Sequence, residues 1–467
     1  MRFSTSDVAS ELGGRLVGPD VVVDGASIDS RTVVAGQLYV PIVAARDGHQ
    51  FIPAALEAGA AAYLTAQQPV GATAVVVDDT AQALLRLGQV ARARLPGGVV
   101  GITGSVGKTT TKDLVRHCLA ASFRVGGSER SFNNELGLPL TLCNAPDDAR
   151  WVVLEMGARG VGHVRRLAAI ARPDIGIVTN VAMAHVEFFG DLEGVARAKS
   201  ELVAALPETG VAVLNFDDPR VARMAAASPC PVLGYAVDAD AEVRAEAVAL
   251  DAELRPRFFL RSPWGDGEVR LGLRGVQQVP NALAAAAAAL WCGVDFEAVQ
   301  HALGEVAGLP LRMEVHRSDG GPVLVVDCYN ANPASTEAAL RSLAALPAAR
   351  KLALLGLMAE LGEQTEHEHR RMQLLAEELG LEVVGYQTGL YGDARVDDVA
   401  AAVALLRGLG AGNAVLIKGS RMAQLEDVAR AYGEAAGVQS LAAGGVAPAG
   451  PSPGPPAGTS MRRLSSP

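Results

Sequence analysis

The chain has 467 residues, of which 49% are hydrophobic and 20% charged, a composition that excludes a disordered protein and predicts about three folded domains. Its net charge of −10 argues against nonspecific binding to nucleic acid or to an anionic membrane. The five cysteines are scattered and form no C-x-x-C pair, which predicts reduced thiols rather than a disulfide framework or a zinc site.

No signal-peptide core follows Met1, and the longest apolar run, residues 282–292, is mostly alanine and too short to cross a bilayer. We therefore expect a soluble, cytoplasmic protein that neither inserts stably in a membrane nor binds nucleic acid, and we expect a monomer.

Residues 1–95 are predicted to form a small α/β domain. Strands are expected over 21–23, 38–40, 61–64 and 74–77, and helices from a Ser6 cap to residue 12, over 51–58 and over 81–95. Two polar clusters fall in loops at strand ends, where ligand groups often lie: Asp29-Ser30-Arg31-Thr32 and Arg46-Asp47-Gly48-His49. Composition alone favours solvated loop charge over a binding role for both.

The string Leu95-Pro96-Gly97-Gly98 predicts a boundary, followed by a central domain over residues 96–310. Strands are expected over 99–102, 151–154, 175–179 and 211–214, with helical stretches between them, which predicts a parallel sheet covered by helices on both faces. Polar residues follow these strands: Thr103, Glu155, Asn180 and Asn215. Because ligands bind at the carboxyl ends of such strands, the four ends together predict one site. β structure is expected over 240–275, and helices over 281–292 and 296–303.

The first of these strands leads into a predicted phosphate-binding loop. The residues are Thr103, Gly104, Ser105, Val106, Gly107, Lys108, Thr109 and Thr110. A strand, a glycine turn and Lys-Thr at the start of a helix let backbone N–H groups surround phosphate, with the lysine on the β- and γ-phosphates and the Thr109 hydroxyl on Mg²⁺. Ile102 stands where the usual motif has its first glycine, so a glycine turn before an ordinary helix stays open as the alternative.

Three more residues are candidates for chemistry in the central domain. A carboxylate at Glu155, beside a triphosphate, is a suitable ligand for Mg²⁺, although a strand-end glutamate can also be a surface residue. His185 follows the third strand of the same sheet, which favours a role in the site. Lys199 has the pattern of a lysine on a helix surface.

A third domain is predicted over residues 311–440, with parallel strands over 323–326, 352–355, 382–384 and 414–417. Asp327-Cys328-Tyr329-Asn330-Ala331-Asn332-Pro333 follows its first strand and can bind a ribose or a peptide backbone, or serve as turn and capping residues. Lys418-Gly419-Ser420-Arg421 follows its last strand and suits a carboxylate or a phosphate. Residues 441–467, rich in Gly, Ala, Pro and Ser, are predicted to be a disordered tail.

These strings resemble the Mur ligases of peptidoglycan synthesis over nearly the whole chain except the tail. The resemblance rests on T-G-S-V-G-K-T-T-T at 103–111, F-N-N-E-L-G-L-P at 132–139, E-M-G-A at 155–158, the block from Thr179 to Lys199, and the two strings of the third domain. N-N-x-x-G-x-P, Y-N-A-N-P and K-G-S-R indicate the branch that adds D-alanyl-D-alanine.

The resemblance implies an ATP- and Mg²⁺-dependent ligase that joins D-Ala-D-Ala to UDP-MurNAc-tripeptide through an acyl phosphate. It implies a small N-terminal α/β domain, a central P-loop domain and a C-terminal Rossmann-like domain. It places Lys108, His185 and Lys199 in catalysis, with Lys199 carbamylated and ligating a second Mg²⁺ beside Glu155 and His185.

Further roles follow from the same resemblance. It places Asn281, Arg312 and Asp327 at the nucleotide; Ser30, Arg31, Arg46, Asp47, Gly48, His49, Asn133 and Asn134 at the UDP substrate; and Asn330, Asn332, Lys418, Ser420 and Arg421 at the dipeptide. One departure is at Gly275-Val276-Gln277-Gln278-Val279-Pro280-Asn281, where Gln277 and Gln278 replace the family's His-Asn.

Two alternatives stay open at this point. A sister ligase that adds another amino acid, or glutamate to folate, would share the phosphate loop. A nucleotide-dependent binding protein without ligase activity is the alternative from a different class, and dependence of phosphate release on both a carboxylate and an amine would separate them.

Overall fold

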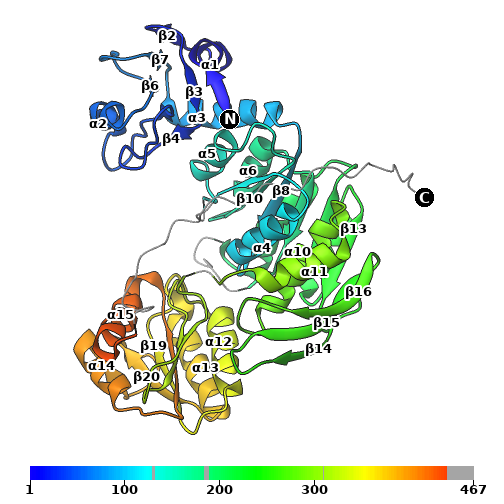
Figure 1. The fold of residues 1–467 in the computed structure, drawn as a ribbon, viewed down its shortest axis with the longest axis vertical. Helices are drawn as coiled ribbons and strands as arrows, with labels where there is room; N and C mark the ends of the chain where they lie inside the picture. The colour runs from blue at the N-terminus through cyan, green and yellow to red at the C-terminus, as the bar shows by residue number, and fades with distance from the viewer. Residues whose placement is uncertain (129–131, 183–188, 309, 439–467) are drawn as a thin grey trace.

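The computed structural model describes residues 1–128, 132–182, 189–308 and 310–438. Within these ranges the strands form four sheets with helices packed on them, which confirms the predicted α/β class. Figure 1 shows residues 1–95 at one end of the molecule, the central sheet in the middle and the third part of the chain at the other end. His185 and the predicted tail at 441–467 lie outside the described residues.

The N-terminal part contains a two-stranded sheet, β1-β3, and a five-stranded sheet in the order β2-β7-β6-β5-β4. Its elements are β1 (Arg2–Ser4), α1 (Thr5–Leu12), β2 (Arg15–Val17), β3 (Val22–Asp24), β4 (Ala26–Ser27), β5 (Leu38–Tyr39), the 3₁₀ helix η1 (Gly48–Phe51), α2 (Ile52–Glu57), β6 (Ala62–Thr65), β7 (Ala74–Val76) and α3 (Thr80–Arg94).

The predicted cap of the first helix is wrong by two residues. Helix α1 begins at Thr5, and the Ser4 hydroxyl accepts a hydrogen bond from the Asp7 amide at 3.0 Å. Ser6 Oγ instead donates to Asp20 Oδ2 at 2.7 Å. The helix starts early because β1 pairs with β3 as far as Ser4, which leaves Ser4 in the extended conformation that an N-cap needs.

The central sheet has nine strands in the order β9-β10-β8-β11-β12-β13-β14-β15-β16, with parallel pairing from β9 to β14. Its elements are β8 (Gly98–Thr103), α4 (Lys108–Ala120), β9 (Val125–Gly127), α5 (Gly137–Cys143), β10 (Trp151–Glu155), α6 (His163–Ala171), β11 (Ile175–Val178), α8 (Leu192–Ala204), β12 (Val211–Asn215), α9 (Pro219–Ala222), the 3₁₀ helix η2 (Arg223–Ala227), β13 (Val232–Ala236), β14 (Val243–Leu250), β15 (Pro256–Ser262), β16 (Gly265–Arg270), α10 (Gln278–Trp291) and α11 (Phe296–Glu305).

The four strands predicted for this sheet lie side by side as β10-β8-β11-β12. The β structure expected over 240–275 is β14, β15 and β16, which extend the same sheet; β14 pairs with β13 in parallel, and β15 and β16 follow in antiparallel pairing. Strands β9 and β13 were not predicted, because glycines replace the side chains that mark a strand: two of three residues in β9, and Gly234 in β13.

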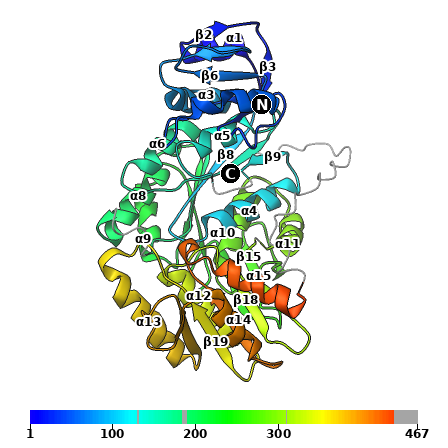
Figure 2. The ribbon, with the colours of Figure 1, turned by 90° about the vertical axis from the view of Figure 1, so that its left-hand side faces the viewer.

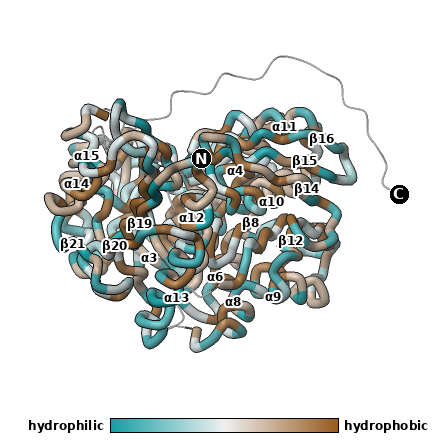
Figure 3. The backbone as a smooth tube through the Cα atoms, turned by 90° about the horizontal axis from the view of Figure 1, so that it is seen from below, coloured by the Kyte–Doolittle hydropathy of each residue, from teal (hydrophilic) through white to brown (hydrophobic). Residues whose placement is uncertain are grey.

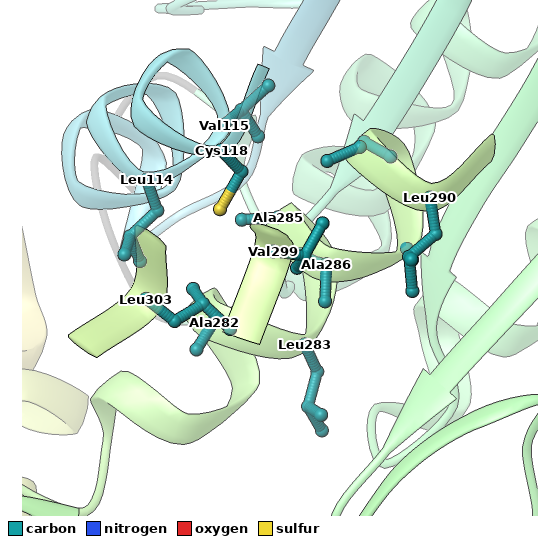
Figure 4. Packing of buried hydrophobic residues seen from close by; sticks show 14 of the residues in the cluster. Leu114, Val115, Cys118, Ala282, Leu283, Ala285, Ala286, Leu290, Val299 and Leu303 are labelled. Atoms are coloured by element: carbon teal, nitrogen blue, oxygen red, sulfur yellow. The ribbon is translucent and has the colours of Figure 1, made fainter. Parts of the chain in front are cut away.

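The alanine-rich helix α10 packs against α4, the helix that follows the predicted phosphate loop. Figure 4 shows Ala285 of α10 close to Cys118 of α4, and Ala282 close to Leu303 of α11, and all of these side chains are buried. A helix that is apolar all round belongs in the interior, and small alanine side chains let a neighbouring helix approach closely. The start of α10, which carries Asn281, is thereby held next to the start of α4.

The third part of the chain forms a six-stranded sheet in the order β17-β18-β22-β19-β20-β21, parallel except for β17. Its elements are β17 (Glu314–His316), β18 (Val323–Val326), α12 (Pro333–Ala345), β19 (Lys351–Leu355), the 3₁₀ helix η3 (Gly362–Gln364), α13 (Thr365–Glu378), β20 (Glu382–Tyr386), β21 (Arg395–Val396), α14 (Val399–Arg407), β22 (Ala414–Lys418), the 3₁₀ helix η4 (Arg421–Ala423) and α15 (Leu425–Ala436).

Two apolar clusters, one with α12 and α13 and the other with α14 and α15, cover this sheet. In Figure 3 the tube is brown along β19, whereas α13 beside it alternates between teal and brown, as expected for a helix with one buried side. The arrangement is the predicted Rossmann-like one.

The N-terminal part is joined to the central sheet through α3. Leu84 and Leu87 of α3 belong to the same buried cluster as Leu138 of α5 and Leu167 of α6, and Figure 2 shows these helices stacked at this junction. Boundaries at 95/96, 310/311 and 440/441 remain predictions. No helix in the described ranges is both long and apolar enough to cross a membrane, and all five cysteines are free, as predicted.

Candidate active site

The loop between β8 and α4 has the shape that the sequence predicts. Gly107 has a left-handed φ of 85° at the N-cap of α4, and a Cβ added there would lie 2.4 Å from Asn281 Oδ1. Glycine is therefore required at this position for both its conformation and its size. The Asn281 oxygen that excludes a side chain here also accepts a hydrogen bond from Thr111 Oγ1 at 3.2 Å.

The loop is held from the other side by the segment that follows β11. Asn180 Oδ1 accepts from the Val106 amide at 2.9 Å, and Asn180 Nδ2 donates to the Val106 carbonyl at 3.0 Å. Thr179 Oγ1 donates to the same carbonyl at 2.7 Å. Ser105 Oγ and the Ala182 backbone exchange two further hydrogen bonds. Asn180, predicted as a polar strand end, thus acts on the backbone of the loop.

Lys108 is the first residue of α4 and folds back over its own loop. Its Nζ donates to the Gly104 carbonyl at 2.8 Å and to the Ser105 carbonyl at 3.2 Å. Burial lowers the pKa of the Lys108 ammonium, the Glu155 carboxylate opposes that shift, and the Arg312 guanidinium adds to it. The lysine therefore lies within electrostatic reach of a carboxylate of the central sheet and a cation near the third sheet.

Glu155, at the end of β10, is 2% exposed and is bound by two neutral donors. Thr109 Oγ1 donates to Oε2 at 2.8 Å, and Asn133 Nδ2 donates to Oε1 at 2.9 Å. Among the described residues the carboxylate forms no salt bridge, and no cluster of three or more His, Cys, Asp or Glu that could hold a metal is found. A hydroxyl and one carboxylate at a phosphate loop nevertheless fit Mg²⁺, which takes few protein ligands and completes its shell with phosphate and water.

Lys199, on α8, is not the surface lysine that its pattern indicated. It is 5% exposed, and its ammonium forms no hydrogen bond or salt bridge with the part of the chain that the structure describes. Burial, and secondarily the charge of Lys108, lowers the pKa of Lys199 well below its ordinary value. The correction has a simple cause: α8 packs on β8 and β11, so one of its polar positions faces inward.

A cavity of about 560 Å³ lies where the phosphate loop faces the third sheet. Its lining includes most of the predicted nucleotide and dipeptide residues: Ser105, Val106, Gly107, Lys108, Thr109, Thr110, Asn281, Arg312, Asp327, Asn330, Asn332 and Lys418. The predicted metal ligand Glu155 and the predicted UDP contact Asn133 line it as well. Thr103, Gly104, Asn134, Lys199, Ser420 and Arg421 lie outside this lining. The structure therefore brings two sheets together around one cavity.

The third-sheet wall is organised by an ion pair. Lys418 Nζ, 1% exposed, donates to Asp327 Oδ2 at 2.7 Å and to the Asn330 carbonyl at 3.0 Å. Arg312 lies over the Tyr329 ring at 4.2 Å. Lys418 thus binds the loop after β18, and Arg312 presents its charge to the cavity.

Two of the predicted dipeptide residues, Asn332 and Arg421, have structural partners of their own, whereas the Ser420 side chain has none within the described ranges. Asn332 caps α12 through a reciprocal pair of hydrogen bonds with Ser335, the capping alternative considered above. Arg421 is exposed and pairs with Glu426 at 2.8 Å. Ser420 is 2% exposed, and its hydroxyl has no partner among the described residues.

The Gln277–Gln278 departure also lies at the cavity. Asn281 Nδ2 donates to Gln278 Oε1 at 2.8 Å, so the replacement residue orients the one family asparagine that is kept. Asn134 Oδ1 accepts from the Leu136 and Gly137 amides at 3.1 and 2.9 Å, at the start of α5.

The two polar clusters of residues 1–95 lie together, apart from this cavity. They follow β4 and β5, which run parallel with Ser27 opposite Tyr39. Burial raises the pKa of Tyr39 to about 12, and the carboxylates of Asp29 and Asp47 add to the shift, so both loops face this ring.

Within these clusters the side chains are tied to one another. Arg31 is exposed and forms an ion pair with Asp29 at 2.6 Å, whereas His49 is buried. His49 Nε2 accepts from the Ala66 amide at 3.1 Å, so its Nδ1–H donates to Asp47 Oδ1 at 2.6 Å. Ser30 is partly buried and Arg46 exposed. His49 is thus fixed as part of the loop, whereas the exposed Arg31 and Arg46 fit the solvated charge that composition favours.

A phosphate loop on one parallel sheet, closed over by a polar edge of a second sheet, defines a nucleotide-binding enzyme of the multi-sheet α/β class. Residues 102–289 match the Mur ligase middle domain, and residues 311–421 match the Mur ligase, glutamate ligase domain. The chain belongs to the Mur ligase family.

Several relatives are similar over most of their length. The UDP-N-acetylmuramoyl-tripeptide–D-alanyl-D-alanine ligase of Mycobacterium tuberculosis is 40% identical, with 88% of this chain and 92% of the relative covered. The crystal structure of MurF from Acinetobacter baumannii has a TM-score of 0.85 at 26% identity, covering 93% of this chain and 99% of that one. MurF from Thermotoga maritima, in complex with ADP, has a TM-score of 0.78 at 27% identity and covers 89% and 99%.

One wall of the cavity was not predicted from the sequence. Ala359, Glu360 and Leu361, in the loop after β19, line it alongside the predicted residues. The sequence does indicate this wall, because the strand over 352–355 was predicted. The carboxyl end of that strand lies on the same edge of the sheet as the ends of β18 and β22.

Proposed function

We propose that this protein is an ATP-dependent amide ligase that joins D-Ala-D-Ala to UDP-MurNAc-tripeptide, a step in peptidoglycan precursor synthesis. The observation that carries the proposal is the single cavity bounded by the phosphate loop on one side and by the Asp327 and Lys418 loops on the other. The names of the curated relatives support this choice of substrates, and the ADP complex of the Thermotoga relative supports the nucleotide.

The proposed reaction begins with attack of the terminal carboxylate of the tripeptide on the γ-phosphate of ATP, which gives ADP and an acyl phosphate. The amine of D-Ala-D-Ala then attacks the acyl carbon, phosphate leaves with the C–O bonding electrons, and the nitrogen loses a proton. Loop N–H groups and Lys108 would position the phosphates and offset their charge. Thr109 and Glu155 would hold Mg²⁺, which supplies further charge neutralisation.

The lowered pKa of Lys199 is consistent with the proposed carbamate. A lysine whose pKa is well below its ordinary value is more often neutral, and its lone pair can attack CO₂ with loss of one proton. The product carries a negative charge in place of a cation, and we propose that it binds a second Mg²⁺ with His185, which lies outside the described residues. Intact mass or ¹³CO₂ NMR of the native protein should detect the adduct; no adduct, together with full activity of Lys199→Ala, would reject it.

The remaining substrate contacts are proposals of the same kind. We place the UDP part at Ser30, Arg31 and the 46–49 loop, with Asn133 and Asn134 toward the central sheet. We place the dipeptide near Asn330, Asn332, Lys418, Ser420 and Arg421. We also propose domains at 1–95, 96–310 and 311–440 with a disordered tail at 441–467, and a cytoplasmic monomer.

Phosphate release measured with UDP-MurNAc-peptides of different length, against D-Ala-D-Ala and single amino acids, tests the proposal. Release should require both the tripeptide substrate and the dipeptide, and Lys108→Ala should abolish ADP formation. Preference for a single amino acid would indicate a sister ligase, and release without an amine would indicate a nucleotide-dependent binding protein. Turnover of Lys108→Ala within about tenfold of the parent would contradict the role of the loop.

A further inference from the structure

The loop after β19, residues 356–361, forms a cavity wall whose conformation must be imposed by its surroundings. Glu360 lies in the cavity lining with a left-handed φ of 63°, which non-glycine residues adopt at a cost of about 1–3 kcal/mol. Its neighbours Met358 and Leu361 are 1% and 2% exposed and belong to the core under the sheet. The loop is therefore anchored from behind.

His369 of α13 provides that anchor through one defined tautomer. Its ring is fully buried, and its Nδ1 lies 2.6 Å from the Thr365 carbonyl, which can only accept, so Nδ1 carries the proton. Nε2 therefore has a free lone pair, and it accepts a hydrogen bond from the Met358 amide at 2.8 Å. Met358 is the residue immediately before the cavity-lining Ala359.

Tyr391 completes the anchor. Its ring packs on the His369 ring with centroids 5.0 Å apart, and its hydroxyl donates to the Gly356 carbonyl at 3.0 Å. The loop so fixed is joined to the neighbouring wall, because the Gly356 amide donates to the Lys418 carbonyl at 2.8 Å and the Ser420 amide donates to the Leu357 carbonyl at 2.9 Å. A shift of the loop would thus move two walls of the cavity.

We propose that His369 is a positioning residue for the active site: its neutral imidazole fixes the Met358 amide and thereby sets the cavity wall formed by residues 359–361. This inference rests on the hydrogen-bond geometry. It depends on the proposed function only for the kinetic measurement.

The charges around the ring are consistent with a neutral histidine. Burial lowers the pKa of His369, and the Thr365 carbonyl and the Glu368 carboxylate oppose the shift. Glu368 is itself paired with Arg371 at 2.8 Å, and Arg371 also binds Glu337 of α12 at 3.1 Å. A protonated ring would direct an N–H at the Met358 N–H, so the anchor exists in the neutral form alone.

The test compares His369→Phe, which keeps a ring but removes both hydrogen bonds, with His369→Gln, whose amide oxygen can still accept from Met358. The matched control is His367→Phe on the exposed side of the same helix, where the histidine side chain is 71% exposed. The first readout is hydrogen exchange of the peptide covering residues 356–361, and the second is KM and kcat for ATP and for the dipeptide in the phosphate-release assay.

His369→Phe should exchange about tenfold faster in this peptide and raise at least one KM about tenfold, as expected for one lost buried hydrogen bond. His369→Gln should recover most of both, and His367→Phe should change neither. If His369→Phe does not fold, Tyr391→Phe, which removes one hydroxyl, should still speed exchange of the same peptide.

Unchanged exchange of the 356–361 peptide in both His369→Phe and Tyr391→Phe would overturn the proposal. A loss of kcat in His369→Phe that matches its unfolded fraction, at unchanged KM, would overturn it as well. Hydrogen exchange can be measured on a protein without activity. If the parent protein does not ligate, the proposed function is rejected, but the exchange comparison still tests the role of His369.

Discussion

Replacing Asn180 by alanine should weaken ATP use without touching any phosphate. Asn180 makes two hydrogen bonds to the Val106 backbone, one from the amide at 2.9 Å and one to the carbonyl at 3.0 Å. The carbonyl keeps a second donor, Thr179 Oγ1 at 2.7 Å, so the substitution mainly leaves the Val106 N–H without its partner. Two full bonds would contribute about 2 kcal/mol, and the surviving bond to Thr179 reduces the expected loss to about 1.4 kcal/mol.

That energy corresponds to a fall of about tenfold in the fraction of loops ordered for binding, and hence in kcat/KM for ATP. The assay is phosphate release at varied ATP with the other substrates saturating, supported by calorimetric titration with ADP. Asn413→Ala is a matched control, since Asn413 also makes two hydrogen bonds to backbone, with Arg350 and Gly410, far from the loop.

A folded Asn180→Ala protein whose kcat/KM for ATP lies within about twofold of the parent would refute this reasoning. It would mean that the other contacts of the loop, from Ser105 to Ala182 and from Asn281 to Thr111, fix its shape on their own. An equal loss in Asn413→Ala would show that the effect is one of general stability.

Three further predictions follow from the same geometry. Gly107→Ala should reduce kcat/KM for ATP at least about 100-fold in the same assay, because its Cβ would lie 2.4 Å from Asn281 Oδ1 at a left-handed φ; activity near that of the parent would contradict the loop geometry. Arg92→Ala should lower the free energy of unfolding by about 2 kcal/mol in urea titration, since Arg92 binds Asp174 at 2.9 Å and the Ala171 carbonyl at 2.8 Å at the α3–α6 junction; an unchanged midpoint would show that the apolar core alone holds this junction. Because the native pKa of His369 is lowered, the unfolded chain binds its proton more readily, so stability should fall as pH drops below about 6.5 and His369→Gln should flatten this slope in thermal melts; parallel pH profiles of the two proteins would argue against it.

The parallel strands of the central sheet and the edge that carries their polar ends were predictable because they depend on local pattern. Apolar runs ended by Thr103, Glu155 and Asn180 mark neighbouring parallel strands, and the βα rule puts their ends on one edge. The same rule applied to β19 would have found the 359–361 wall. The rule does not say what each polar group binds: Asn180, for example, binds the backbone of the phosphate loop.

Burial and pairing between distant segments explain the remaining differences. Nothing in A-R-A-K-S-E-L indicates that Lys199 faces inward, because its position depends on how α8 packs on β8 and β11. Lys418 was predicted as a cation for a substrate, but Asp327, 91 positions earlier, already binds it at 2.7 Å. Ion pairs across parallel strands are not visible in a one-dimensional pattern.

The charges left in the cavity argue for a divalent cation alongside the nucleotide. Lys418 is neutralised by Asp327, so Lys108 and Arg312 are the lining cations that form no salt bridge within the described ranges. Glu155, Asp218 and Glu360 also line the cavity, so three carboxylates outside the Lys418–Asp327 pair stand against these two cations. A triphosphate adds about four negative charges, which a lining without an excess of positive charge does not balance in a low-dielectric cavity. Mg²⁺ between Glu155, Thr109 and the phosphates would supply the difference. Chelation of Mg²⁺ should therefore weaken ATP binding by more than Glu155→Gln does, and a Glu155→Gln protein that binds ATP independently of Mg²⁺ with parental affinity would contradict this balance of charge.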